Sequence, residues 1–110
     1  MTIASFFVKD NEYEVSITGH SNYKKGNEPD IVCSACSALS LALLQNLKVL
    51  QAVGDLRLLA ISNMKDGDVS CVYAPKEDDM SKDRVMHLTT IIRDGYRMLE
   101  RKYPVNVSVI

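Results

Sequence analysis

The chain has 110 residues, of which 46% are hydrophobic and 25% are charged, and its formal net charge at pH 7 is −1. This length fits a single domain, which we predict to span residues 1–110. The composition excludes a disordered tail, a collagen-like chain and a coiled-coil rod. Because the charges nearly cancel, no overall electrostatic field draws the protein to nucleic acid or to a membrane surface. We therefore expect no direct nucleic-acid partner.

The cysteine content and the N-terminus point to a reducing compartment. Three cysteines, Cys33, Cys36 and Cys71, are too few for a disulfide framework. Residues 1–5 contain no basic region ahead of an apolar stretch, as a secretory signal would. The longest uncharged stretch, residues 31–47, is shorter than the roughly 20 residues of a membrane helix. We expect a soluble cytoplasmic protein with no membrane association.

The start of the chain predicts a β-hairpin. A run of β-branched and aromatic residues at 3–8 is followed by a polar turn at 9–11. Tyr13, Val15 and Ile17 then alternate with polar residues. This period of two is typical of a strand with one buried face.

A polar segment at residues 20–30 follows the hairpin and contains Gly26. Loops of this length in small domains often carry function. The segment has no apolar anchor apart from Tyr23. We expect residues 21–29 to be mobile without a substrate and to close over one when it binds.

A long helix is predicted from Ile31 to Val53, because Asp30 is a favourable N-cap and Gly54 a favourable stop. Its surface from residue 35 to residue 50 is almost entirely apolar or small. A sheet covers only one side of such a helix. We therefore expect a second copy of the chain to cover part of the remainder, which predicts a homodimer.

The second half of the chain contains a hairpin, a second helix and a final strand. We predict strands at 56–64 and 69–73 around a turn at 65–68, a linker at 74–80, a helix from its cap at Ser81 to Tyr103, and a last strand at 105–109. The resulting order is ββαββαβ. Because hairpins dominate, we predict an α+β fold, a two-layer sandwich in which two helices cover one face of a mainly antiparallel sheet.

The residues best suited to chemistry are His20, where a strand passes into the loop, and Cys33, in the first turn of the long helix. Unpaired N–H groups and the helix dipole at that position favour a thiolate over a thiol. A histidine brought close by the loop can take the thiol proton and later return it to a leaving amine. A packed cysteine and a solvated loop histidine would fit the same spacing, so the residues alone leave both interpretations open.

Cys33 and Cys36 also form a Cys-x-x-Cys motif, which is typical of thiol redox proteins. A thioredoxin-like protein enters this motif directly from a parallel strand, whereas here the polar segment 20–30 precedes it. A zinc site would need further ligands such as Cys71 or His87, and we expect no bound metal. A redox protein therefore remains an alternative.

Several segments together resemble the signature of the ribosomal-processing cysteine protease family Prp. They are Gly19-His20-Ser21, the loop containing Gly26, and the block Asp30-Ile31-Val32-Cys33-Ser34-Ala35-Cys36-Ser37-Ala38-Leu39. The chain length and the predicted order of elements resemble that family as well. The chain departs from the family pattern at Cys36, which replaces a small apolar residue, and in a longer segment between Gly26 and Asp30.

The resemblance implies roles for individual residues. It makes Cys33 the nucleophile and His20 its general base. Asp30 could orient His20, organise the loop or cap the helix, and Ser37 could line the site or fill a close helix contact. Gly19 allows the backbone to turn where a side chain would clash. We expect backbone N–H groups of the first helical turn to hold the oxyanion.

The resemblance also implies a function. Such a protein is a cytoplasmic, homodimeric endopeptidase, and its substrate is the precursor of a large-subunit ribosomal protein, from which it removes an N-terminal extension. Hydrolysis of the acyl-enzyme needs only water, so we expect no cofactor. A non-catalytic dimeric binding module on the ribosome remains an alternative from another class.

Overall fold

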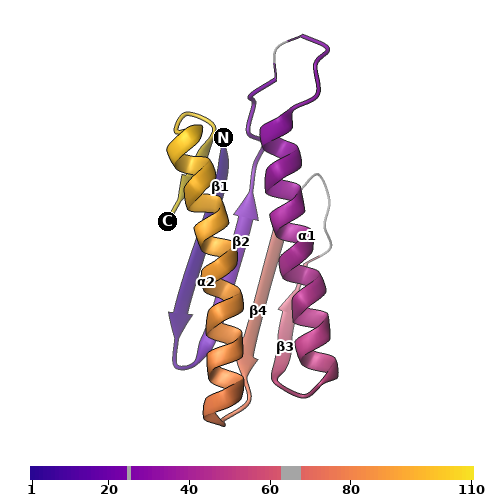
Figure 1. Cartoon of the computed structure of the whole chain (residues 1–110), viewed down its shortest axis with the longest axis vertical. Helices are drawn as coiled ribbons and strands as arrows, with labels where there is room; N and C mark the ends of the chain where they lie inside the picture. The colour runs from indigo at the N-terminus through magenta and orange to yellow at the C-terminus, as the bar shows by residue number, and fades with distance from the viewer. Residues whose placement is uncertain (25, 63–67) are drawn as a thin grey trace.

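The computed structural model describes residues 1–24, 26–62 and 68–110. Its elements follow the predicted order ββαββαβ (Figure 1). They are β1 (Thr2–Lys9), β2 (Glu12–Thr18), α1 (Ile31–Ala52), β3 (Leu56–Ile61), β4 (Val69–Pro75), α2 (Asp79–Lys102) and β5 (Val107–Val109). The predicted α+β class is confirmed.

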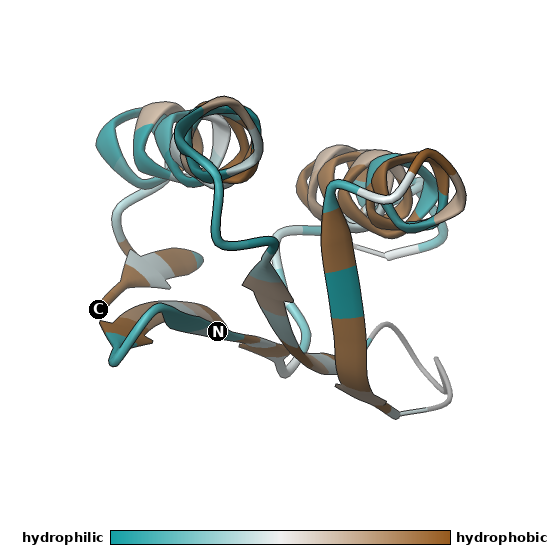
Figure 2. Cartoon of the chain, turned by 90° about the horizontal axis from the view of Figure 1, so that it is seen from below, coloured by the Kyte–Doolittle hydropathy of each residue, from teal (hydrophilic) through white to brown (hydrophobic). Residues whose placement is uncertain are grey.

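The five strands form one sheet in the order β3-β4-β2-β1-β5. The pairs β1–β2, β2–β4 and β3–β4 are antiparallel, and only β5 runs parallel to its neighbour β1. Both helices lie on the same side of this sheet, which gives the two layers seen end-on in Figure 2. The predicted mainly antiparallel sandwich is therefore confirmed, with one parallel pair added at its edge.

Some element ends differ from their predicted positions. Helix α2 begins at Asp79, because the carboxylate of Asp78 accepts the Ser81 N–H at 2.8 Å and caps the helix three residues earlier than predicted. Strand β3 ends at Ile61, and the last two residues of the predicted strand 56–64 lie outside the described residues. Residues 63–67, which include most of the predicted turn at 65–68, lie outside the described residues.

The core lies between the sheet and the two helices. Fully buried side chains come from both layers and include Val15, Val32, Leu43, Leu47, Tyr73 and Tyr96. Gly95 of α2 faces Leu39 of α1, where an added Cβ would come within 2.7 Å of a Leu39 methyl group. The absence of a side chain at residue 95 therefore allows the two helices to pack closely, although glycine in a helix costs about 1 kcal/mol relative to alanine.

Helix α1 has 22 residues and a mean hydropathy of 1.4 over its most apolar window, so it is long and apolar enough to cross a membrane by these measures. The argument against a membrane span used the uncharged stretch 31–47, which is shorter than α1. It therefore does not apply to the whole helix. One side of α1 is nevertheless buried in the domain, at Val32, Cys36, Ser40, Leu43 and Leu47. The Ser40 hydroxyl is also hydrogen-bonded to the hydroxyl of Tyr96 in α2 at 2.6 Å. A core helix of a globular domain has these features.

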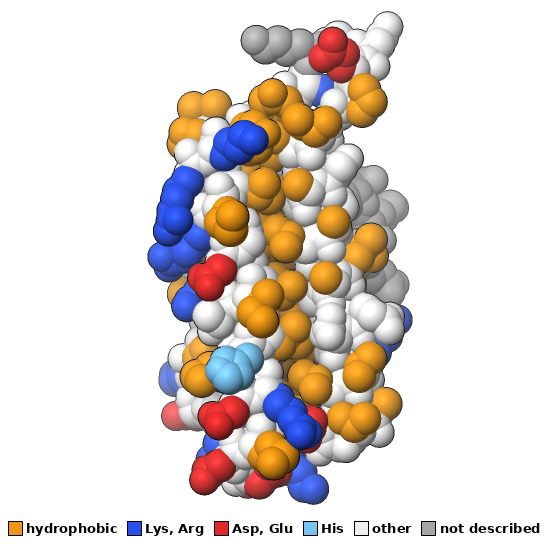
Figure 3. Space-filling view, in the orientation of Figure 1, with side chains coloured by type: hydrophobic (Ala, Val, Ile, Leu, Met, Phe, Trp, Pro, Cys, Tyr) orange, Lys and Arg blue, Asp and Glu red, His pale blue; other side chains and the backbone are white. Residues whose placement is uncertain are grey.

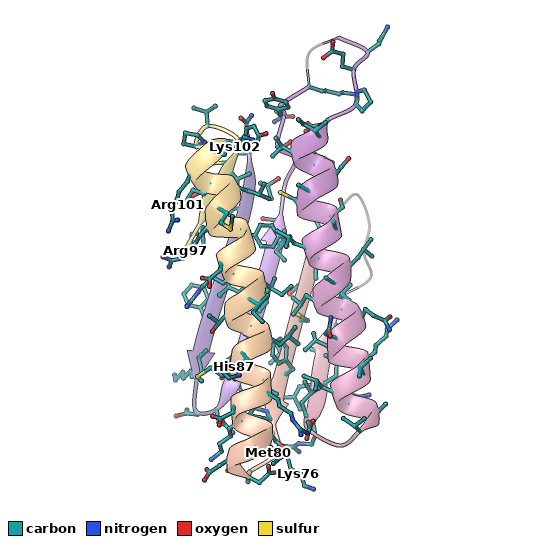
Figure 4. The ribbon with its side chains drawn as sticks, in the orientation of Figure 1. Lys76, Met80, His87, Arg97, Arg101 and Lys102 are labelled. Atoms are coloured by element: carbon teal, nitrogen blue, oxygen red, sulfur yellow. The ribbon has the colours of Figure 1, made fainter. Side chains whose placement is uncertain are left out.

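The two helices present different surfaces to solvent. In Figure 3, hydrophobic side chains gather over α1 and along its junction with α2, whereas Lys and Arg side chains gather on the outer side of α2. The exposed large apolar residues of α1 include Ile31, Leu41 and Val49. On α2, Arg97 and Arg101 project away from α1 (Figure 4). The apolar surface of α1 is thus left uncovered in the single chain.

Candidate active site

His20 and Cys33 lie at the same end of the molecule, where β2 ends and α1 begins (Figure 1). Both residues line two neighbouring depressions with volumes of about 210 and about 410 Å³. The smaller one is also lined by Thr2, Ile17, Gly19, Cys36 and Ser37, and the larger one by Asn22, Lys24 and Asp30. The loop therefore brings together the two residues proposed from the sequence as base and nucleophile.

Gly19 sets the exit of the chain from β2. Its φ is +89°, in the region that side chains disfavour, and an added Cβ would collide with the backbone carbonyl oxygen of Met1. Its N–H donates to Oδ1 of Asp68 at 3.0 Å. The predicted backbone role of Gly19 is thus present in the structure, and the glycine fixes the direction in which His20 leaves the sheet.

Gly26 lies away from Cys33 and His20, in the exposed part of the loop. Its φ is +66°, it is exposed, and no atom lies within 4 Å of a Cβ added there. It lines neither depression beside Cys33. The structure therefore gives Gly26 a conformational role in the loop and does not bring it to the site.

Asp30 caps α1 and also organises the loop. Its Oδ1 accepts the Cys33 N–H at 2.9 Å, and its Oδ2 accepts the N–H groups of Tyr23 at 3.1 Å and Lys24 at 3.4 Å. Burial alone would raise the pKa of this carboxyl, but the hydrogen bonds from Cys33, Ser21, Lys24 and Tyr23 outweigh it and lower the pKa to about 2. Of the roles considered for Asp30, capping and loop organisation are the two that its contacts support.

The base of the loop is anchored more firmly than its polarity suggests. Besides the bonds to Asp30, the ring of Tyr23 packs edge-on against that of Tyr103, with 5.1 Å between the centroids. Ser21 is 1% exposed, and its carbonyl oxygen accepts a hydrogen bond from Nδ2 of Asn106 at 2.8 Å. These contacts hold the first residues of the loop, and the mobility of residues 21–29 without a substrate stays a prediction.

Ser21 is the residue that sequence reasoning missed. Its N–H lies 3.4 Å from Sγ of Cys33, and its Oγ lies 3.1 Å from the same sulfur. The same Oγ is 2.8 Å from each carboxylate oxygen of Asp30. The only available signal was its place directly after His20, and nothing in the spacing distinguished it from the other polar residues of the loop.

The amide at Cys33 was expected to be unpaired, and this is wrong because Asp30 caps it. The polar contacts of the Cys33 sulfur come instead from Ser21. Among residues 1–24, 26–62 and 68–110, no hydrogen bond joins His20 to Cys33. Catalytic hydrogen bonds are often formed only once a substrate is bound, so this geometry is compatible with a His–Cys pair.

Cys36 differs from Cys33 in its surroundings although both lie on α1. Cys36 is 6% exposed, and burial raises the pKa of its thiol to about 11, with smaller contributions in the same direction from Cys33 and Asp30. Cys71 is fully buried in β4, and burial raises its pKa to about 11 as well. All three cysteines are free, and the described residues contain no cluster of potential metal ligands. Burial therefore keeps the thiols of Cys36 and Cys71 protonated at neutral pH.

A known protein family matches almost the whole length of the chain. A sequence model of the family described as Cysteine protease Prp matches residues 1–108. The chain belongs to this cysteine protease family. A search of curated proteins finds no match.

Solved structures of similar fold cover almost the whole chain. One is an essential ribosomal processing protease Prp from S. aureus with a covalently linked product peptide, which is 18% identical over 99% of this chain and 97% of that chain, with a TM-score of 0.65. The same protease with a substrate peptide gives 18% identity, coverage of 100% and 98%, and a TM-score of 0.64. SMU.848 from Streptococcus mutans is 25% identical over 99% of this chain and 91% of that chain, with a TM-score of 0.68. These likenesses support the fold.

Proposed function

We propose that this cysteine protease uses Cys33 as nucleophile and His20 as general base to cut a peptide bond near the N-terminus of a ribosomal protein precursor. The observation that carries the proposal is that His20 and the half-buried Cys33 line the same two depressions at the start of α1. Cys36 and Cys71, the other thiols, are buried.

The chemistry follows from this pair. His20 takes the thiol proton, and the thiolate of Cys33 attacks the carbonyl carbon of the scissile peptide bond. The C–N bond then breaks, the amine leaves with the proton from the imidazole, and the acyl group stays on sulfur as a thioester. A water molecule, deprotonated by His20, attacks the thioester and releases the carboxylic acid and the thiol. No redox partner or cofactor is required for this balance.

The two depressions suggest how a substrate lies across the site. Apart from His20 and Cys33, the smaller one is lined by small or apolar residues such as Ile17 and Cys36, whereas the larger one is lined by Lys24 and Asp30. Because Cys33 and His20 border both, an extended peptide can place its scissile bond over the sulfur with one side chain in each depression. We propose that an apolar side chain occupies the smaller one.

The substrate class rests on the family and on the S. aureus protease, which is described as a ribosomal processing protease. We propose that the substrate here is a large-subunit ribosomal protein with an N-terminal extension, processed in the cytoplasm. The test is to incubate the chain with the precursor encoded in the same genome and to measure product masses. Two fragments whose masses sum to that of the precursor plus one water support the proposal, and an unchanged precursor contradicts it.

Alkylation distinguishes this function from a binding module. Iodoacetamide on Cys33 should stop cleavage of the precursor, because the sulfur is the nucleophile. If the unmodified chain binds the precursor without cutting it, and alkylation leaves that binding unchanged, the chain is a non-catalytic binding module. The matched control variant is Cys33→Ala, which should bind the precursor but not cut it.

We also propose that the chain works as a homodimer through α1. The exposed side of this helix carries Leu41 at 55% and Val49 at 47% exposure, and Lys48 is the only charged residue between Ile31 and Ala52. A second copy of this surface can cover it, because its single charged side chain, Lys48, can keep its ammonium group in water at the edge of the interface. Sedimentation at micromolar concentration should give twice the monomer mass. Leu41→Glu should give a monomer, whereas Ile91→Glu, at a position 66% exposed on α2, should leave the dimer intact.

A further inference from the structure

The hydroxyl of Ser21 lies between the capping carboxylate of Asp30 and the sulfur of Cys33. Its Oγ is 2.8 Å from both oxygens of the carboxylate and 3.1 Å from Sγ. The residue is 1% exposed, and Nδ2 of Asn106 holds its carbonyl oxygen at 2.8 Å. The heavy atoms of Ser21 are therefore held in place, while the hydroxyl hydrogen is free to turn.

One hydroxyl hydrogen cannot serve both neighbours at once. A serine hydroxyl has a single hydrogen and two acceptor lone pairs. While Cys33 is a thiol, the hydrogen of Ser21 belongs on the ionised carboxylate of Asp30, which is the stronger acceptor, and the S–H group donates to Oγ. Once Cys33 is a thiolate it has no hydrogen to donate, and a hydroxyl still turned to Asp30 would present only lone pairs to the charged sulfur.

Asp30 can release this hydrogen without losing its solvation. The backbone N–H groups of Cys33, Tyr23 and Lys24 all donate to the same carboxylate, at 2.9, 3.1 and 3.4 Å. The cap of α1 and the base of the loop are therefore maintained when the hydroxyl of Ser21 turns away. The sulfur, in contrast, has only the N–H and the hydroxyl of Ser21 as polar contacts among the described residues.

We propose that Ser21 is a positioning residue whose hydroxyl turns from Asp30 to Cys33 when the thiol ionises, and that it thereby favours the reactive thiolate. The thiol proton leaves to His20 or to water, and the hydroxyl keeps its own hydrogen throughout. The inference rests on the proposed function in taking the Cys33 thiolate as the nucleophile. The exchange of hydrogen bonds itself requires no substrate.

Other charged or titratable groups surround Cys33, and their effects on the sulfur can be distinguished from that of the Ser21 hydroxyl. His20 and Lys24 line the larger depression, and Asp68 lies at the amide of Gly19. Cys36, which lines the smaller depression, is buried and stays protonated at neutral pH. None of these side chains is hydrogen-bonded to the sulfur among the residues that the structure describes. Substituting Ser21 therefore tests its hydroxyl alone.

The experiment measures the rate at which iodoacetamide alkylates Cys33 in the full chain as a function of pH, with the adduct located by mass spectrometry. In Ser21→Ala the Asp30 carboxylate keeps its three backbone N–H donors, whereas a thiolate at Cys33 keeps only the N–H of residue 21. The loss of the hydroxyl therefore destabilises the thiolate more than the thiol. We expect Ser21→Ala to move the midpoint of the profile upward by about one pH unit, which makes alkylation about tenfold slower below the midpoint.

Two further variants control the interpretation. Ser34→Ala removes a hydroxyl from the residue next to Cys33, but that hydroxyl is bonded to the carbonyl oxygen of Asp30 and not to sulfur. It should leave the profile unchanged. Ser21→Thr keeps a hydroxyl at the site and should keep the wild-type midpoint. Circular dichroism establishes that each variant is folded.

A midpoint for Ser21→Ala at or below the wild-type value would overturn the proposal, as would a folded Ser21→Thr that behaves like Ser21→Ala. The cleavage assay supplies a separate readout. Ser21→Ala should cleave slowly at neutral pH and recover as the pH rises, which a merely structural defect would not do. If the wild-type chain cleaves no precursor, the proposed function fails while the alkylation profile still decides the role of Ser21.

Discussion

The N-termini of the two helices are built in the same way and yet differ in what they expose. Each begins with an aspartate cap, Asp30 in α1 and Asp78 in α2. Each carboxylate accepts the N–H of the third helical residue, Cys33 at 2.9 Å and Ser81 at 2.8 Å. Each also receives a serine hydroxyl at 2.8–2.9 Å.

The difference lies in the third helical residue and its surroundings. In α2 this residue is Ser81, which is 2% exposed and whose hydroxyl lies 2.9 Å from an oxygen of Asp78 and 3.1 Å from an oxygen of Asp55. Asp55 in turn binds Arg84 at 2.8 Å, so the polar groups there are used within the fold. In α1 the third residue is Cys33, which borders two open depressions. The capped start of α1 therefore offers an accessible nucleophilic side chain, whereas the capped start of α2 does not.

The largest expected effect comes from removing the group that distinguishes the two caps. Cys33→Ala should lower kcat/KM for precursor cleavage by more than about 10³-fold, because the nucleophile is lost. Its fold should survive, as judged by circular dichroism. His20→Ala should have nearly the same effect on cleavage. Retained cleavage in Cys33→Ala would contradict the account.

The corresponding substitution at the third residue of α2 should reduce stability and leave activity unchanged. Ser81→Ala removes the hydroxyl of the corresponding third residue and should lower the free energy of unfolding by about 1–2 kcal/mol, because the buried hydroxyl that lies between two carboxylates is lost. Its kcat/KM should remain close to that of the wild type at temperatures where it is folded. Urea titration and the cleavage assay on the same sample measure the two effects.

The caps themselves provide the next comparison. Asp30→Ala and Asp78→Ala should each lower the free energy of unfolding by about 1 kcal/mol through loss of the cap. Only Asp30→Ala should also reduce cleavage, by about 10²-fold, since it frees the loop that carries His20 and Ser21. Equal activity of the two variants would mean that Asp30 acts as a cap alone.

Acid should reduce the difference in stability between the wild type and a variant that cannot ionise at residue 30. Hydrogen bonds lower the pKa of Asp30 to about 2, below its unfolded value of about 3.9. A carboxylate with a lowered pKa stabilises the fold above the unfolded pKa, and this contribution is lost as the pH falls through the folded pKa. The difference in unfolding free energy between the wild type and Asp30→Asn should therefore shrink between pH 4 and pH 2. A difference that stays constant over this range would contradict the assignment.

The smallest effect is expected at Cys36. Because burial raises the pKa of its thiol to about 11, Cys36 is no nucleophile at neutral pH. Cys36→Ala should therefore retain most of the wild-type cleavage, although the side chain lines the smaller depression. If this folded variant were as inactive as Cys33→Ala, the two sulfurs would act together. The redox interpretation would then replace the protease mechanism.

The sequence predicted the fold well because its signals are local. Period-two alternation at Tyr13, Val15 and Ile17 and the Asp30 cap are read directly from neighbouring residues, and β2 and α1 lie where these signals placed them. The cap of α2 was misplaced because Asp78 and Ser81 both fit that role, and only their mutual hydrogen bond distinguishes them.

The site was predicted in part. His20 and Cys33 could be chosen because their residue types and their places at a strand end and a helix start suit a base and a nucleophile. Ser21 could not, because its contacts with Asp30 and Cys33 arise only when the loop folds back over the helix start. Nor could Asn106, which reaches Ser21 from the segment before β5, 85 residues along the chain.

The most direct test of the central claim is to trap the acyl-enzyme. The precursor is mixed with the wild-type chain, the reaction is quenched in acid within the first turnover, and the modified peptide is identified by mass spectrometry. We expect an adduct on Cys33 whose mass is that of the N-terminal extension less one water. Cleavage that proceeds with an adduct on Cys36, or on any residue other than Cys33, would contradict it.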